Sequence, residues 1–444
     1  MFKEKYNAGK KLRDETPRHS HAEWKVPSRR PSVVSMIEAS NYDRLPNLVP
    51  IRHSRMTESP FVFYRATASL MARDLSTTLS SGITVQACGD CHLMNFGCFA
   101  TPERTMVADI NDFDETNPGP WEWDLKRLAT SFMLACRKKN FRKEDERNIT
   151  LELINSYQNK MREYSEMNFL ELWYTKFTVE DIRKLSSSKK LQDAVERTIE
   201  KAEMLSHEKV FHKITQSAIT RREITDHPPL IYHPANIEGH MELINQFIEN
   251  YKNTLQPDRR LLLDQYKIID MALKVVGVGS VGTRCYVVLM MNDNNEPIFV
   301  QVKEARQSVL EPYTQPSKYS HRGERVVQGQ RILQAASDIF LGWSVGLEGR
   351  HFYLRQLRDK KISFNVDSYD KFALTLYARL CGNILAHAHC KSAQGPFICG
   401  YIGKGEVFAE AICKFAAAYA DQTEKDYDDF MKGVRDGKLP VEKE

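Results

Sequence analysis

Acidic and amide side chains gather in two short segments in the first third of the chain. The first, 88–97, reads Cys-Gly-Asp-Cys-His-Leu-Met-Asn-Phe-Gly, and the second, 107–114, reads Val-Ala-Asp-Ile-Asn-Asp-Phe-Asp. Glycines near both ends of the first segment allow tight bends, so Asp90 and Asn95 can approach each other on one loop. A carboxylate beside an amide oxygen can orient a hydroxyl group and hold a hard cation such as Mg²⁺.

A second set of residues, far downstream, is suited to binding phosphate. Gly277, Gly279 and Gly282 lie between two predicted strands, Lys303 lies on the next strand, and Glu324 lies on the helix after it. Glycines between two strands argue against a Rossmann site and favour a hairpin that covers phosphates. Backbone N–H groups and a lysine neutralise nucleotide phosphates, while a carboxylate holds the lysine. Two other side chains are alternative partners for the lysine, Glu304 and Gln328.

Hydrophobic periodicity predicts the elements that position these residues. A short strand at 83–87 delivers the first segment, a hairpin spans 98–108, and an amphipathic helix covers 121–137. The stretch 142–251 carries no chemical motif and is predicted to be a set of helices that shape a substrate pocket. The remaining predictions are a helix at 66–79, strands at 285–291, 298–305, 340–345 and 351–357, and helices at 367–390 and 407–427.

The bulk properties exclude several classes of protein. At 444 residues the chain is long enough for two or three packed units. A net charge of +5 does not require nucleic acid, and no apolar run approaches the roughly 18 residues of a membrane span. With no apolar signal core at its N-terminus, the chain is expected to be cytoplasmic, with neither nucleic acid nor a membrane as partner.

Nine cysteines are scattered along the chain, and their odd number and wide spacing do not fit a disulfide framework. We expect buried free thiols. The alternative is a zinc site built from four side chains, Cys88, Cys91, His92 and Cys98.

The order Gly-Asp-x-His-x-x-Asn, then Asp-Phe, then Asp-Leu at 124–125, resembles the catalytic core of aminoglycoside-phosphotransferase-like kinases. This resemblance implies that Asp90 orients the acceptor hydroxyl or accepts its proton, and that Asn95 and Asp112 bind Mg²⁺. It also implies that Asp124 braces the loop.

The second segment departs from the kinase pattern at one position. The residue that follows Asp112-Phe is Asp114, where the family has glycine. Asp109 is a rival metal ligand, and the sequence leaves open whether either of these two carboxylates shares the metal.

The two halves of the resemblance occur in the reverse of the kinase order. A kinase begins with its small lobe, whereas here the catalytic-loop segment comes first. A circular permutation of an α+β, two-lobed kinase-like fold explains this, provided that Cys390 lies near the strand that starts the loop. The predicted parts are an N-terminal arm (1–50, mobile or draped on the surface), the catalytic and metal-binding part of the large lobe (51–140), a helical insertion or large-lobe helices (141–265), the small nucleotide-binding lobe (266–360) and the C-terminal helices of the large lobe (361–444).

Most of the chain also resembles a bacterial group known as domain of unknown function 2252, a name that implies no substrate. The segments that carry this resemblance are 55–65, 89–97, 109–131 and 323–343.

These residues together predict an ATP-dependent phosphotransferase that uses Mg²⁺ and moves a phosphoryl group to a hydroxyl of a small-molecule or protein acceptor. Nucleotidyl transfer is an open variant of that reaction. One alternative is a non-catalytic, pseudokinase-like module that binds nucleotide or a partner. Another is a metal-dependent phosphoesterase that uses the Asp90 loop together with Gly382, Asn383, His387 and His389.

Overall fold

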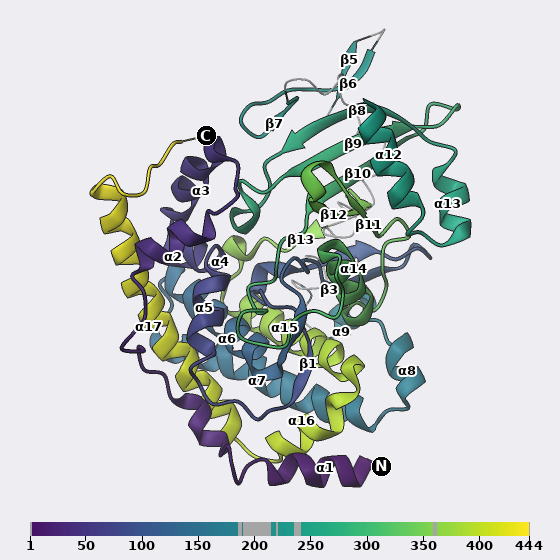
Figure 1. The fold of residues 1–444 in the computed structure, drawn as a ribbon. Helices are drawn as coiled ribbons and strands as arrows, with labels where there is room; N and C mark the ends of the chain where they lie inside the picture. The colour runs from purple at the N-terminus through teal and green to yellow at the C-terminus, as the bar shows by residue number, and fades with distance from the viewer. Residues whose placement is uncertain are drawn as a thin grey trace.

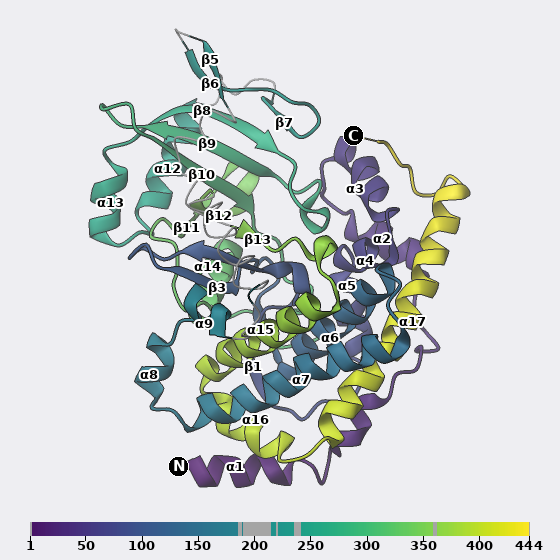
Figure 2. The same ribbon diagram turned by 180° about the vertical axis from the view of Figure 1, so that it is seen from behind.

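We analysed a computed structural model of the chain, which describes residues 2–184, 189, 215–218, 221–234, 241–357 and 362–443. The fold is a mixture of α and β structure, with one large sheet at one end and a larger helical part at the other (Figures 1 and 2). Within the described ranges, no helix is long and apolar enough to cross a membrane.

The main sheet has six antiparallel strands in the order β11-β12-β10-β9-β8-β7. Their bounds are β7 (Ile231–Tyr232), β8 (Lys267–Lys274), β9 (Cys285–Met291), β10 (Pro297–Glu304), β11 (Gly342–Val345) and β12 (His351–Gln356). Lys303 of β10 lies opposite Cys285 on one side and Tyr353 on the other. This register places the lysine in the centre of the sheet and not at an edge.

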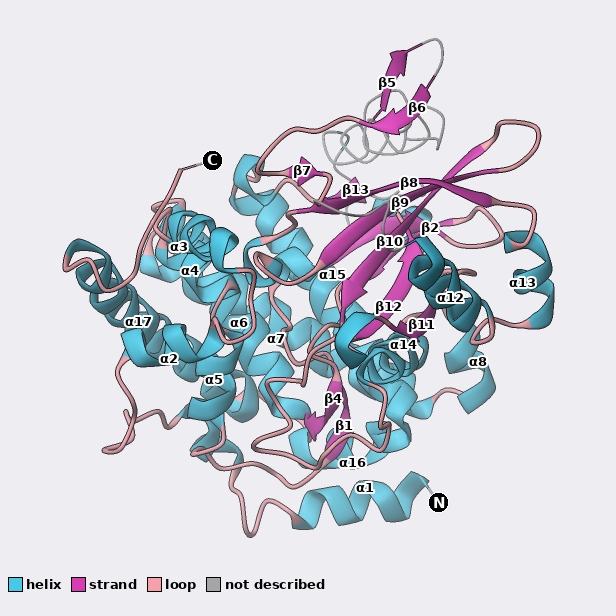
Figure 3. Ribbon diagram, turned by 45° about the horizontal axis from the view of Figure 1, so that its top comes forward, coloured by secondary structure: helices cyan, strands magenta, loops and turns pink. Residues whose placement is uncertain are grey.

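Helices α12 (Met241–Lys252), α13 (Pro257–Leu263) and α14 (Arg322–Leu333) lie beside this sheet (Figure 3). Tyr251 of α12 is fully buried in one apolar cluster with Val302 of β10 and Leu354 of β12. Burial of such side chains supplies most of the stability of a sheet–helix layer. One face of the sheet is therefore anchored by helices.

The helical part is built from long helices that pack against one another: α6 (Trp121–Lys138), α7 (Lys143–Glu166), α15 (Lys371–His389), α16 (Gly395–Ile402) and α17 (Val407–Arg435). Helices α7 and α15 pack closely against each other. A Cβ atom on Gly382 would lie 2.4 Å from the carbonyl oxygen of Leu153, so this crossing requires glycine.

Short elements join the two parts. β1 (Thr84–Ala87) pairs with β4 (Asn117–Pro120), and β2 (Phe96–Ala100) lies between β3 (Met106–Ile110) and β13 (Ile362–Ser363). Four short helices precede them: α2 (Val33–Ser40), α3 (Val49–Met56), α4 (Pro60–Arg65) and α5 (Ala68–Leu75). After α7 the chain forms α8 (Phe169–Tyr174) and α9 (Val179–Lys184).

Most predicted elements occur where the sequence placed them, but three regions differ. The predicted helix at 66–79 is the shorter α5. The N-terminal arm is helical from the start, because α1 (Phe2–Lys11) packs closely on α16 through Gly9. The stretch predicted to be helical contains β5 (Thr215–Ala218), β6 (Arg221–Ile224) and β7. In it, Ile224 is buried beside the main sheet, and 185–188, 190–214, 219–220 and 235–240 lie outside the described residues.

Candidate active site

The loop after β1 turns sharply before it reaches Asp90. Gly89 has a φ of +81°, and a Cβ atom there would lie 2.2 Å from the carbonyl oxygen of Glu115, so the turn requires glycine. Asp124, in the first turn of α6, accepts hydrogen bonds from the backbone N–H groups of Cys88 (2.6 Å) and Gly89 (3.0 Å). Asp124 therefore ties the loop to the start of the helix, where a carboxylate is favoured.

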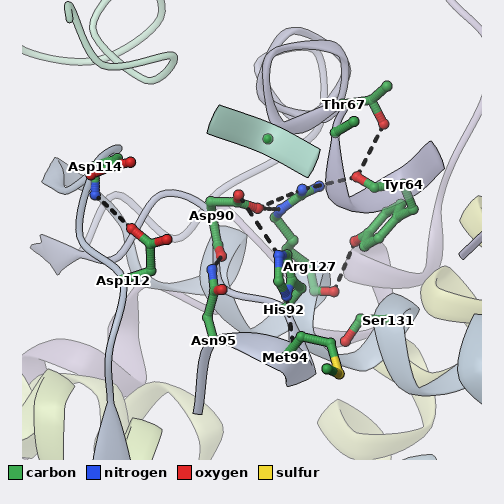
Figure 4. Close-up of polar contacts among 12 residues, drawn as sticks. Tyr64, Thr67, Asp90, His92, Met94, Asn95, Asp112, Asp114, Arg127 and Ser131 are labelled. Carbon is green, nitrogen blue, oxygen red and sulfur yellow. Dashed lines mark hydrogen bonds and ion pairs between the residues drawn. The ribbon is translucent and has the colours of Figure 1, made fainter. Parts of the chain in front are cut away.

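A buried arginine, one helical turn after Asp124, holds Asp90 (Figure 4). Nε and Nη2 of Arg127 lie 2.7 and 2.6 Å from Oδ1 of Asp90, and the guanidinium lies 4.4 Å from the ring centroid of Tyr64. Burial raises the pKa of Asp90, and the charge and hydrogen bonds of Arg127 offset part of that rise. Arg127 fixes the Asp90 carboxylate in one orientation. Because 22% of the Asp90 side chain is exposed, the carboxylate still reaches the solvent.

His92 contacts Asp90 from the other side. Its Nδ1 accepts a hydrogen bond from the backbone N–H of Met94 (3.2 Å), so a neutral ring carries its proton on Nε2, which lies 3.9 Å from Oδ2 of Asp90. Burial, and then the charges of Arg65 and Arg127, hold the pKa of His92 well below its usual value. His92 is therefore a neutral neighbour of the carboxylate and not a second charge on it.

Asn95 connects the two acidic segments. Its Nδ2 donates to the backbone oxygen of Asp90 (2.7 Å), and its own backbone oxygen accepts from the N–H of Asn111 (2.9 Å). The amide nitrogen is thus directed at the loop, which leaves the amide oxygen as its free ligand atom. Asp112, next to Asn111, is brought to the same region.

Lys303 of β10 meets the second acidic segment directly. Its Nζ lies 2.6 Å from Oδ2 of Asp114 and 3.9 Å from Oδ1 of Asp112. Tyr353 on β12 donates its hydroxyl to the other oxygen of Asp114 (2.6 Å). Burial opposes a charge on Lys303, but the two carboxylates outweigh it and hold the lysine pKa well above its ordinary value. The lysine therefore stays protonated, with both carboxylates beside it.

The two carboxylates beside Lys303 have different acidities. Burial and the negative charge of Asp114 raise the pKa of Asp112. Burial acts on Asp114 in the same direction, but the ion pair with Lys303 and the hydrogen bonds outweigh it, so the pKa of Asp114 is lowered. Asp114 is the tight partner of the lysine, whereas Asp112, whose side chain is 34% exposed, is the freer carboxylate.

The glycine turn between β8 and β9 is held by arginines from the N-terminal segment. Arg44 donates to the backbone oxygens of Val281 and Gly279 (3.0 Å for Gly279), and Arg55 donates to that of Val276. Gly282, at a φ of +86°, faces the Arg44 side chain. Gly277 and Gly279 line the cavity described next, whereas Gly282 packs against the Arg44 side chain that holds the turn.

The Asp90 loop, the second acidic segment, β10 and the glycine turn surround one cavity of about 1010 Å³, a size in the upper range of small-molecule and cofactor sites. The predicted site residues on its wall are Asp90, Asn95, Asp112, Gly277, Gly279 and Lys303. Arg65, Arg355 and Asp114 also line it. The two segments and the glycine turn, which are separated by more than 160 residues in the sequence, thus meet at a single site.

Two predicted site residues, Gly282 and Glu324, lie off this cavity wall. Within the described part of the chain, the ion-pair partners of Lys303 are Asp112 and Asp114, so Glu324 does not hold the lysine. The next residue on α14, Arg325, points inward and donates to the backbone oxygen of Asp114 (2.8 Å). Helix α14 thus holds the acidic segment 107–114 in place through the guanidinium of Arg325.

Asp109, the rival metal ligand, is buried and accepts hydrogen bonds from the protein backbone. One of its carboxylate oxygens accepts from the backbone N–H of Ala335 (2.7 Å) and the other from its neighbour Ile110 (2.8 Å). Asp109 is 2% exposed and does not line the cavity. Burial raises its pKa to about 6, with the two backbone hydrogen bonds opposing the rise.

The residues of the two metal-based alternatives have other partners. Among the described residues, the group with metal-ligand spacing is Cys88, Cys91 and Asp124, without the other two predicted zinc ligands, and Asp124 is already bound to the loop. His389 bonds to Tyr157 (2.8 Å), and His387 to the backbone oxygen of Leu172 (2.9 Å). Both histidines are buried in helix packing and lie off the cavity wall.

Sequence reasoning missed three groups of the site: Arg355, which lines the cavity, and Arg127 and Tyr353, which hold the cavity carboxylates Asp90 and Asp114. The signal for Arg127 was present, because it follows Asp124 by three residues on one helix and such residues share a face. Tyr353 and Arg355 alternate on β12 and therefore point to the same face of the sheet. Arg355 donates to the backbone oxygen of Asn111 (3.2 Å).

Comparison with known proteins gives one match. Neither a curated protein sequence nor a solved structure matches the chain significantly. The family model described as "Uncharacterized protein conserved in bacteria (DUF2252)" matches residues 44–433, which include every group on the cavity wall named above. The chain belongs to this DUF2252 family.

Proposed function

We propose that this protein is an ATP-dependent phosphotransferase with a circularly permuted, kinase-like arrangement of two lobes. The observation that carries the proposal is the meeting of Lys303 with Asp112 and Asp114 in the cavity that also contains Asp90 and the glycine turn. A lysine, a covering glycine turn, a metal carboxylate and a separate carboxylate for the hydroxyl are the parts that phosphoryl transfer needs.

The order of elements fits a permutation. The backbone N–H of Gln86, in β1, donates to Oγ of Ser392, just after the end of α15 (2.9 Å). The long helix thus ends beside the strand that begins the catalytic loop, as it would if the chain ran from one into the other. This contact supports the proposal that the chain has the kinase order of elements with its termini at a different place, as in a circular permutation.

The residues fit Mg²⁺ as a cofactor. Asp112 offers a partly exposed carboxylate, and Asn95 offers an amide oxygen, both on the cavity wall; such hard oxygen donors are the ligands that Mg²⁺ prefers. Bound Mg²⁺ would neutralise phosphate charge. Asp114 is already engaged with Lys303 and Tyr353, so it is not the metal carboxylate.

The chain's own groups have distinct tasks in the proposed reaction. Lys303 binds the phosphates of ATP with the donors that Asp114 leaves free. The acceptor hydroxyl oxygen attacks the terminal phosphorus, the bond from that phosphorus to the bridging oxygen breaks, and ADP leaves. Asp90 takes the hydroxyl proton, and Arg127 keeps its carboxylate in one orientation.

Titration of the protein with ATP, with and without Mg²⁺, tests this proposal. We expect Mg²⁺-dependent binding that Asp112→Asn weakens at least tenfold. Asp109→Asn is the matched control, because it changes a neighbouring aspartate of the same segment that lies off the cavity, and it should leave the affinity within a few-fold. Equal titrations for the wild type and Asp112→Asn would overturn the metal assignment, and absence of any nucleotide binding would overturn the function.

A further inference from the structure

Arg65 is a cavity arginine that the proposed reaction does not yet use. It ends α4 and lines the cavity. In the described part of the chain its guanidinium has no hydrogen-bond or ion-pair partner, and its Nε is buried without one. Burial lowers the pKa of Arg65, with the charge of Asp90 as the strongest opposing influence. An unpaired, largely buried cation is costly, which indicates a place for an anion.

The other arginines on this wall are either paired within the protein or exposed. Five of them donate hydrogen bonds to backbone or side-chain oxygens, and Arg322 is exposed to solvent. The five paired arginines are Arg44, Arg52, Arg306, Arg350 and Arg355. Arg65 therefore differs from them in being both shielded and available.

The backbone around Arg65 is fixed on both sides. The carbonyl oxygen of Tyr64 accepts from Nη2 of Arg127 (3.1 Å), and that of Ala66 accepts from Nη2 of Arg52 (3.0 Å). The carbonyl oxygen of Arg65 itself would lie 3.5 Å from a Cβ atom on Gly279. Arg65 is thus held between the glycine turn and the Arg127–Asp90 pair.

We propose that Arg65 binds a phosphoryl group at the Asp90 end of the cavity, an inference that rests on the proposed function of the same site. A guanidinium matches phosphate oxygens with two parallel hydrogen bonds. The group has two possible sources: the terminal phosphate of ATP, or a phosphate that enters separately as part of the acceptor. Both place negative charge beside the Asp90 carboxylate, where Arg65 offsets it.

Arg65→Gln, with Arg73→Gln as the matched control, tests this assignment, because Arg73 lies in the last turn of α5 and off the cavity wall. The dissociation constants to be measured are those for Mg-ATP, for Mg-ADP, and for inorganic phosphate in the presence of saturating Mg-ADP. Loss of one charged hydrogen-bonding group from a shielded site should weaken its ligand about 10- to 100-fold. Arg73→Gln should change none of the three, and thermal unfolding midpoints check that both variants fold.

Two outcomes support the proposal and identify the source. Weaker Mg-ATP binding by Arg65→Gln with unchanged Mg-ADP binding assigns Arg65 to the terminal phosphate. Weaker phosphate binding with unchanged nucleotide binding assigns it to a separate phosphate. A folded Arg65→Gln protein with all three constants unchanged overturns the proposal while leaving the phosphotransferase function intact. Conversely, Arg65-dependent phosphate binding without any nucleotide binding would overturn the function alone.

Discussion

Asp90→Asn should separate chemistry from binding at this site. The substitution keeps the shape of the side chain, and the amide oxygen can still accept from Nε and Nη2 of Arg127. It removes the negative charge and the group that we propose takes the hydroxyl proton. A positioned acid or base contributes about 10²–10⁴ to the rate, so turnover should fall by that factor, or about 3–5 kcal/mol of activation free energy. Affinity for Mg-ATP should stay within a few-fold.

The structure also predicts a cost in stability. Arg127 is 2% exposed, and removal of one partner of a buried ion pair costs about 3–5 kcal/mol. Because asparagine keeps both hydrogen bonds and Asp90 is partly exposed, we expect a smaller loss, about 1–3 kcal/mol. A fall in activity must therefore be distinguished from partial unfolding.

A second buried aspartate–arginine pair supplies the control. Asp74 accepts from Nε (2.9 Å) and Nη2 (2.8 Å) of Arg30, away from the cavity wall. Asp74→Asn should cause a similar loss of stability, measured by urea unfolding, without loss of turnover. Slow ATP hydrolysis or autophosphorylation, followed under saturating Mg-ATP, is the activity assay. If Asp90→Asn turned over ATP as fast as the wild type, Asp90 would not be the base and this interpretation of the loop would be wrong.

Three further experiments address neighbouring groups. Lys303→Met should weaken Mg-ATP binding by at least about tenfold in calorimetric titrations, whereas Glu324→Gln should leave the affinity within about twofold. The reverse ranking would support the sequence prediction that Glu324 holds the lysine. The pKa of Asp109, raised by burial to about 6, means that the folded state binds this proton more tightly than the unfolded state. Deprotonation of Asp109 therefore lowers the free energy of unfolding by about 2 kcal/mol as the pH rises from about 4 to 6, and the wild type should lose that amount relative to Asp109→Asn in urea unfolding across this interval; parallel curves would contradict it. Arg44→Ala should raise amide hydrogen exchange at 277–282 several-fold, because it removes two of the bonds that hold the glycine turn; unchanged exchange would show that other contacts fix it.

Local patterns were sufficient for much of the fold. The amphipathic helix predicted at 121–137 is α6, and the hairpin predicted at 98–108 is the β2–β3 pair. The strand that carries Lys303 was also placed correctly. Each of these elements depends on residues that are close in the sequence, such as alternating or helically spaced apolar side chains, so the sequence contains the necessary information.

Local patterns could not predict which side chains pair with each other across the site. The partner of Lys303 is Asp114, which is 189 residues earlier in the chain, and the pairing of Asp90 with Arg127 links a loop to a helix interior. Such pairs depend on the way whole elements pack, which local patterns in a sequence do not reveal. The strands β5–β7 were missed for the same reason, since Ile224 becomes buried only once the main sheet exists.

The choice of Asp114 as the partner of Lys303 has a consequence for how the site assembles. In the kinase pattern the lysine partner lies on a helix, so a helix movement can break the pair. Here the partner lies two residues from Asp112, and the same short segment supplies the proposed metal carboxylate and the lysine anchor. Arg325 of α14 donates to the backbone oxygen of Asp114 (2.8 Å) and to that of Thr116, so the helix fixes the segment from behind. Movement of α14 should therefore displace the proposed metal carboxylate and the lysine partner together, which would couple the proposed phosphate binding to the proposed metal binding through one short segment of chain.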